Sequence, residues 1–124
     1  MASSNTQNFQ IKANNFQYQK KLSTLVASGD AVATSRDNDI QIRANEIKYN
    51  EISKILKATG NVRITNLNED FVLKSDEVLY ILKLAKIESN TPSQIIDILG
   101  NTIKTKNFIY LLNDNLIKLN SINI

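Results

Sequence analysis

IQIRANEIKYNEISKILKATGNVRIT, residues Ile40–Thr65, is a stretch that the rest of the chain repeats. Shifted back by 31 residues, it aligns with Phe9–Thr34, FQIKANNFQYQKKLSTLVASGDAVAT, over 26 positions without a gap. Shifted forward by 31 residues, it aligns with Phe71–Ser89, and a weaker fourth copy follows at Ile103–Leu119. One position of the repeat holds all the tyrosines of the chain: Tyr18, Tyr49, Tyr80 and Tyr110. A fixed period of this size is typical of stacked units, none of which can bury its apolar face alone.

The first segment of each copy alternates apolar or small residues with polar ones, as in Ile42-Arg43-Ala44. Alternation with a period of two predicts a strand with one buried face. The polar position is basic in every copy: Lys12, Arg43, Lys74 and Lys104. Like charges on neighbouring strands are unfavourable, and either a bound anion or the carboxylates Glu46, Asp76 and Glu77 would relieve them. The alternative interpretation is a solvated outer face without a ligand.

Midway through each copy the apolar positions shift by one residue, in the second copy from Ile42 and Ala44 to Ile47 and Tyr49. An extra residue within a strand produces such a shift. We therefore expect a β-bulge or bend at the equivalent places of three copies, Asn14-Asn15, Asn45-Glu46 and Asp76-Glu77.

The second half of the repeat contains a further apolar segment that ends in Gly29-Asp30 or Gly60-Asn61. Glycine can adopt a positive φ there, which predicts a tight turn or a bulge before a short last strand. In the third copy Asn90-Thr91-Pro92 replaces the glycine. Residues Glu77–Lys86 have apolar side chains at helical spacing. The equivalent segment of the second copy has no such helical pattern, so the register of the repeat predicts a strand.

The sequence thus predicts an all-β protein in which stacked repeats of about 31 residues form an open apolar groove. The residues that share the inward phase are predicted to line this groove: Ile11, Ala13, Phe16, Tyr18, Ile42, Ala44, Ile47, Tyr49, Leu56, Val62, Ile64, Leu73, Val78, Tyr80 and Ile87. The tyrosine ladder could instead stack the bases of single-stranded nucleic acid. Its common phase with the other inward residues favours the groove, and we expect no nucleic-acid partner.

Composition excludes most catalytic chemistry. Without cysteine or histidine the chain has no thiol nucleophile, no Ser–His dyad and none of the usual zinc or haem ligands. The carboxylate pairs Glu69-Asp70 and Asp76-Glu77 are the remaining candidates, and neighbouring residues of a strand point to opposite faces. There is no glycine-rich phosphate loop. The sequence predicts a non-enzymatic protein that needs no metal or cofactor.

The organisation of the chain is simple. Residues 1–8 are polar, and we expect a disordered leader or a cloning remnant there. Residues 9–124 are expected to form a single domain. No apolar run approaches the length of a membrane-spanning helix. The net charge of +3 fits anionic partners weakly.

Three short motifs at fixed spacing resemble a known family. They are Ala44-Asn45-Glu46-Ile47, Ala58-Thr59-Gly60-Asn61-Val62 and Ser75-Asp76-Glu77-Val78-x-Tyr80. Together they are similar to the OstA-like domain of the lipopolysaccharide transport proteins LptA and LptC and of the amino-terminal part of LptD. The match runs from Phe9 to Tyr110; the third copy departs from it by lacking Gly-Asn, and the fourth copy is weak. A whole LptA-like protein and a domain of LptD both fit.

The resemblance implies a β-jellyroll in the periplasm whose groove holds the acyl chains of lipid A during lipopolysaccharide transport to the outer membrane. It also implies pairing of edge strands with other OstA-like jellyrolls, and we expect a head-to-tail homo-oligomer. The alternative is a structural module that pairs through its edge strands without a lipid cargo.

Overall fold

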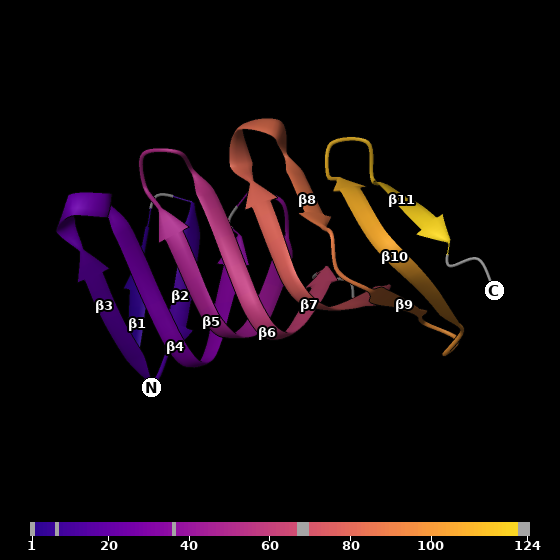
Figure 1. Ribbon diagram of the computed structural model, residues 1–124, viewed down its shortest axis with the longest axis horizontal. Helices are drawn as coiled ribbons and strands as arrows, with labels where there is room; N and C mark the ends of the chain where they lie inside the picture. Colours follow the sequence, from indigo (N-terminus) through magenta and orange to yellow (C-terminus); the bar gives the residue numbers. More distant parts are fainter. Residues whose placement is uncertain (1, 7, 36, 67–69, 122–124) are drawn as a thin grey trace.

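A computed structural model describes residues 2–6, 8–35, 37–66 and 70–121. The described residues form one antiparallel sheet of eleven strands with two short 3-10 turns (Figure 1). The strands are β1 (Ala2–Asn5), β2 (Phe9–Ala13), β3 (Asn15–Gln19), β4 (Thr24–Ser35), β5 (Ile40–Asn50), β6 (Ile55–Asn66), β7 (Phe71–Ile81), β8 (Lys86–Ser89), β9 (Ser93–Asp97), β10 (Thr102–Leu111) and β11 (Leu116–Ser121). The predicted all-β class is confirmed. In the part of the chain that the structure describes, no helix is long and apolar enough to cross a membrane.

The long strands bend in the middle and divide the sheet into two halves. Residues 24–28 of β4 pair with β3, whereas residues 32–35 pair with β2. We call the part that contains β3, β8 and β11 the upper half-sheet, and the part that contains β1, β2 and β9 the lower half-sheet. Strands β4, β5, β6, β7 and β10 contribute to both halves. The inner faces of the two halves pack on each other in a single hydrophobic core.

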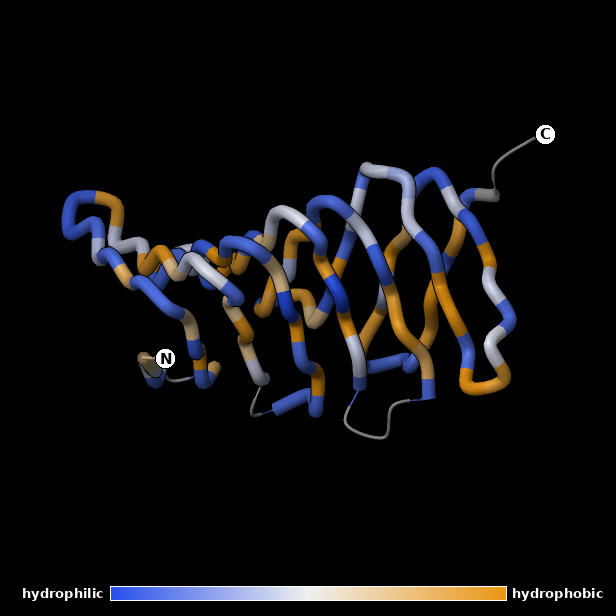
Figure 2. Tube along the Cα trace, turned by 90° about the horizontal axis from the view of Figure 1, so that it is seen from below, coloured by the Kyte–Doolittle hydropathy of each residue, from blue (hydrophilic) through white to orange (hydrophobic). Residues whose placement is uncertain are grey.

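The repeat places equivalent residues side by side across the sheet. One row of cross-strand partners runs through the upper half-sheet: Tyr18, Leu25, Tyr49, Leu56, Tyr80, Ile87, Tyr110 and Ile117. A second row runs through the lower half-sheet: Ile11, Ala33, Ile42, Ile64, Leu73, Ile95 and Ile103. Apolar residues (orange) alternate with polar residues (blue) along the strands in Figure 2. The expected equivalence of Tyr18, Tyr49 and Tyr80 on successive layers is confirmed.

The bend lies where a glycine of one strand packs against an asparagine of its neighbour. The register shifts between Ser28 and Ala31 and again between Thr59 and Val62, so the bulges contain Gly29-Asp30 and Gly60-Asn61. Both glycines have positive φ values, +79° and +81°. The opposing Asn45 also marks the shift in burial phase within β5. The bend predicted at Asn45-Glu46 and its equivalents Asn14-Asn15 and Asp76-Glu77 is present, but a bulge there was wrongly predicted, because the extra residue lies in the neighbouring strand. At the two glycine sites, where the sequence allows a turn or a bulge, the bulge is correct because β4 and β6 continue through it.

Residues Glu77–Lys86 form no α-helix. Strand β7 continues to Ile81, a 3-10 turn follows at Leu82–Leu84, and Ala85 has a φ of 47° before β8 begins. The helical spacing of the apolar residues therefore arises from a strand that runs into a turn. The prediction of a strand is confirmed as far as Ile81.

The amino-terminal residues differ from expectation. Residues Ala2–Asn5 form β1, which pairs with β2 from Ala2 opposite Ala13 to Asn5 opposite Gln10, where the sequence predicts a disordered leader. Thr6 closes the connection, because its Oγ1 accepts a hydrogen bond from the Phe9 amide at 2.9 Å. Backbone pairing needs no apolar side chains, so a polar segment can join the edge of a sheet. Residues 1, 7 and 122–124, which the domain prediction includes, lie outside the described residues.

Candidate functional site

The space between the half-sheets is the candidate site. The predicted inward residues are buried there, with the exceptions of Phe16 and Tyr18. Phe16 is half-buried and packs against the core. Tyr18 remains 49% exposed, because β3 ends the upper half-sheet and pairs only with β4. Its hydroxyl donates a hydrogen bond to Glu51 Oε2 at 3.3 Å. Burial of Tyr18 was thus wrongly predicted, since the repeat pattern does not show which copy lies at an edge.

Aromatic residues of the two half-sheets meet on the side opposite the bend, which we call the mouth. Phe9, the first residue of β2, makes edge-to-face contacts with Tyr49 and Tyr80, with ring centroids 5.3 and 5.5 Å apart. Phe71 and Tyr110 form the same contact at 5.6 Å. Such pairs are each worth about 0.5–1.5 kcal/mol beyond the area they bury. They close the mouth with contacts that are specific but few.

The tyrosine hydroxyls at the mouth bind asparagines of the lower loops. Tyr49 Oη donates to Asn8 Oδ1 at 3.3 Å, and Asn38 Nδ2 donates to Tyr80 Oη at 2.6 Å. Burial raises the pKa of Tyr49, Tyr80 and Tyr110 above the usual value of 10.0, although the bond from Asn38 lowers the pKa of Tyr80 in part. These hydroxyls therefore stay protonated and uncharged at neutral pH.

Small residues line the interior beside the bend. Three cross-strand pairs lie there, Ala31–Ala44, Val62–Ser75 and Ser93–Thr105, and the Ser93 hydroxyl donates to Ser75 Oγ at 3.0 Å. Ser75 lies in a cluster of hydroxyls, 2.9 Å from Ser89 Oγ and 2.8 Å from Thr91 Oγ1. This cluster lies where the third copy lacks its glycine and where the strand is interrupted between β8 and β9.

Sequence reasoning missed the hydroxyl cluster. Its signal was the replacement of Ala44 and Ala58 by Ser75 and Ser89 at equivalent positions of the third copy. Among the described residues, no buried side-chain nitrogen or oxygen lacks a hydrogen-bond partner, so these hydroxyls satisfy one another. The interior is therefore apolar along the mouth and polar beside the bend in its carboxy-terminal half.

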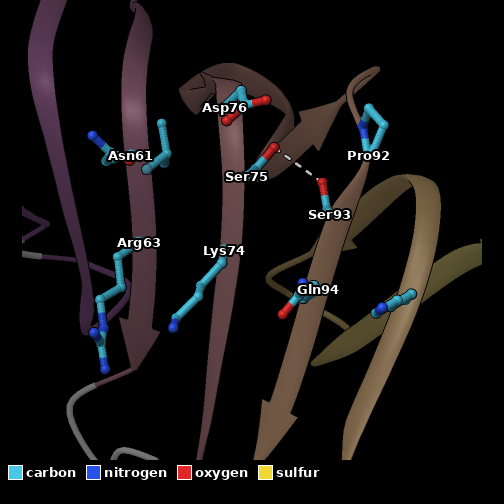
Figure 3. A pocket seen from close by; sticks show the side chains of 10 residues that line it. Asn61, Arg63, Lys74, Ser75, Asp76, Pro92, Ser93 and Gln94 are labelled. Atoms are coloured by element: carbon cyan, nitrogen blue, oxygen red, sulfur yellow. Dashed lines mark hydrogen bonds between the residues drawn. The ribbon is translucent and has the colours of Figure 1, made fainter.

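The basic residues of the repeat lie on the outer face. Lys12, Arg43, Lys74 and Lys104 fall in one cross-strand row, which also contains Val32, Arg63 and Gln94. A hollow of about 600 Å³ opens over this row, and Figure 3 shows Arg63, Lys74, Gln94 and Asp76 around it. Glu46 and Glu77 do not relieve the row: they bind Lys48 at 3.6 Å and Lys57 at 2.9 Å in the upper half-sheet.

The described residues contain no group of three or more histidine, cysteine, aspartate or glutamate side chains that could hold a metal ion. The carboxylates of Asp76 and Glu77 do not converge, because Asp76 borders the outer hollow and Glu77 binds Lys57. Glu69 of the other predicted pair lies outside the described residues.

Comparisons with known proteins identify the family. The sequence model described as "LptC: Lipopolysaccharide-assembly, LptC-related" matches residues 3–121. A search of curated proteins finds no match. The fold is similar to the crystal structure of LptH from Pseudomonas aeruginosa, "the LptA homologous periplasmic component of the conserved lipopolysaccharide transport device". The TM-score is 0.74 at 15% sequence identity, over 94% of this chain and 84% of that one.

At this level of identity the likeness to LptH shows a shared fold, and the family match carries the assignment. The resemblance inferred from the repeat motifs is confirmed. Proteins of this transport family are non-enzymatic, which agrees with the prediction from composition. The chain belongs to the LptC-related family of lipopolysaccharide-assembly proteins.

Proposed function

We propose that the space between the half-sheets binds the acyl chains of lipopolysaccharide in the periplasm, and that the protein passes this lipid toward the outer membrane. The observation that carries the proposal is the unbroken register of inward residues. The row from Tyr18 to Ile117 crosses the whole upper half-sheet, and its members are apolar or aromatic. A row of constant chemistry suits a cargo that moves along it, because one position offers the same contacts as the next.

The half-sheets must part before an acyl chain can enter, since Tyr49, Tyr80 and their neighbours fill the interior. Each buried CH₂ group contributes about 0.8 kcal/mol, so a dozen contribute roughly 10 kcal/mol before ordering costs. Opening the mouth breaks the aromatic contacts of Phe9 and the two tyrosine–asparagine hydrogen bonds. Each of these interactions is worth about 1 kcal/mol, and an acyl chain between the half-sheets would cover again the apolar side chains that part. We infer that acyl chains enter through the mouth.

The edges of the sheet support assembly with further jellyrolls. Strands β1 and β3 end the amino-terminal side of the two halves, and β11 ends the carboxy-terminal side. Edges with unpaired backbone groups recruit further strands. A contact between β11 of one molecule and β3 of the next would be heterologous and could extend into a bridge of copies or of related proteins. The same edges favour the second candidate, a strand-pairing module without lipid.

Global replacement of leucine by its diazirine analogue tests lipid binding with little change in shape. We expect irradiation with lipopolysaccharide to give adducts at the buried Leu56 and Leu73. The exposed Leu84 and Leu99 serve as controls in the same molecule, at 61% and 83% exposure. Adducts confined to the exposed leucines would overturn the proposal. Full absence of adducts together with concentration-dependent assembly would favour the module without lipid.

A further inference from the structure

Three cations lie directly beside one another on the outer face of the lower half-sheet. Arg43 is the cross-strand partner of Arg63, and Arg63 is the partner of Lys74. All three side chains are exposed, while their chain neighbours Ile42, Ile64 and Leu73 are fully buried. Like charges placed directly opposite each other destabilise a sheet. A bound anion would therefore stabilise the arrangement.

In the upper half-sheet, like charges on neighbouring strands are compensated by carboxylates of the same chain. Lys48 and Lys57 are also direct cross-strand partners. There, Glu46 lies 3.6 Å from Lys48, and Glu77 lies 2.9 Å from Lys57. The three ion pairs found among the described residues include none of Arg43, Arg63 or Lys74. The two halves carry the same like-charge contact, and among the described residues the ion pairs to carboxylates form only in the upper half.

Two of these cations, Arg63 and Lys74, border a hollow. It has a volume of about 600 Å³, and its lining includes Arg63, Lys74, Gln94, Lys104 and Asn61. Figure 3 shows the Arg63 and Lys74 side chains extending side by side along their strands. Neighbouring strands are about 4.8 Å apart, so Lys104, two strands beyond Lys74, adds a cation roughly 10 Å away. Asp76 also borders the hollow and offsets part of this charge.

We propose that this hollow binds a phosphate-bearing anion. Arg63 would bind two oxygens through its planar guanidinium, and Lys74 would add a point charge to the same group. Asn61 and Gln94 offer side-chain amide N–H donors, and Lys104 can meet a second anionic group. The site faces away from the interior, so it does not require lipid between the half-sheets. The phosphate can belong to a free molecule or to a lipid headgroup.

A titration with inorganic pyrophosphate at constant ionic strength, monitored by ¹⁵N NMR, tests the site. We expect saturable shifts at the backbone amides of residues 61–63, 74 and 94. The double variant Arg63→Gln/Lys74→Gln should bind about tenfold more weakly. The matched control Lys48→Gln/Lys57→Gln removes the same charge from the same outer surface and should bind like the parent.

A second arm uses vesicles that contain phosphatidic acid, with phosphatidylcholine vesicles as the blank. Selective binding of either probe that depends on Arg63 and Lys74 supports the site, and the probe that binds more tightly identifies the source of the phosphate. Equal weakening by the two double variants would reduce the effect to net charge and overturn the proposal. Failure of both probes to saturate would overturn it as well.

Discussion

Replacement of Gly60 by alanine should destabilise the bend between the half-sheets. Gly60 has a φ of +81°, a conformation that costs an alanine about 1–2 kcal/mol. A Cβ there would lie 2.9 Å from Asn45 Cβ and 2.5 Å from Asn45 Nδ2. The amide can rotate away, but the Cβ of Asn45 is fixed to the backbone of β5, so a strand must shift. Overpacking of this kind costs about 1–3 kcal/mol.

The expected loss for Gly60→Ala is about 3 kcal/mol, once the smaller entropy of the unfolded alanine chain is deducted. For a chain of 124 residues this corresponds to a fall in Tm of roughly 10 °C. Gly100→Ala is the matched control, because Gly100 has a similar φ of +87° and no atom within 4 Å of the added Cβ. Its expected loss is the conformational part alone, about 1 kcal/mol.

Urea unfolding monitored by circular dichroism measures both losses. In an Asn45→Gly background, the loss for Gly60→Ala should fall to that of Gly100→Ala, because the colliding atoms are gone. Equal losses for the two glycine variants in the parent background would refute the reasoning that the bend depends on glycine–asparagine packing.

The remaining predictions concern the mouth and the edges. Tyr80→Phe should cost about 1 kcal/mol, since it removes the bond from Asn38, and thermal unfolding would measure it. The raised pKa of Tyr80 means that the unfolded chain releases this proton near pH 10.0 while the folded chain retains it. The contribution of the Tyr80 hydroxyl to the free energy of unfolding is thus fully present below pH 10 and is lost as the pH rises further. Tyr80→Phe should reduce the fall of stability with pH in this range, and an unchanged fall would contradict the raised pKa of Tyr80. Ile117→Pro should weaken self-association, because it removes a backbone donor from the edge strand β11. Sedimentation velocity across a wide concentration range would show this; association as strong as the parent's would exclude β11 as the contact.

The repeat register predicts most of the fold because each copy has to bury the same apolar positions against its neighbours. Positions such as Ile42, Ile47 and Tyr49 must face inward wherever a neighbouring copy covers them, and the structure buries them. Tyr18 escapes this rule because no further copy covers it. The pattern of a repeat describes its interior members and says little about its ends.

Two other features could not be predicted from apolar periodicity. Strand β1 is held by backbone pairing alone, which leaves no hydrophobic pattern in its sequence. The hydroxyl cluster forms because Ser75 contacts Ser89 at the end of β8 and Ser93 at the start of β9. From the sequence alone these serines would be expected at the surface. The basic residues of the repeat were visible in the sequence, but two facts follow only from the pairing register and the structure. Arg43, Arg63 and Lys74 lie directly beside one another, and Glu46 and Glu77 bind Lys48 and Lys57 in the upper half-sheet instead.

The claim that lipid enters between the half-sheets is tested most directly by NMR of isoleucine methyl groups during a titration with lipopolysaccharide. The chain offers buried probes, Ile42, Ile47 and Ile64, and exposed probes, Ile52 at 74% and Ile98 at 76%. We predict that the methyl signals of the buried isoleucines shift and saturate together, while those of Ile52 and Ile98 stay in place. Shifts confined to the exposed isoleucines, with the buried signals unchanged at saturating lipid, would contradict the account.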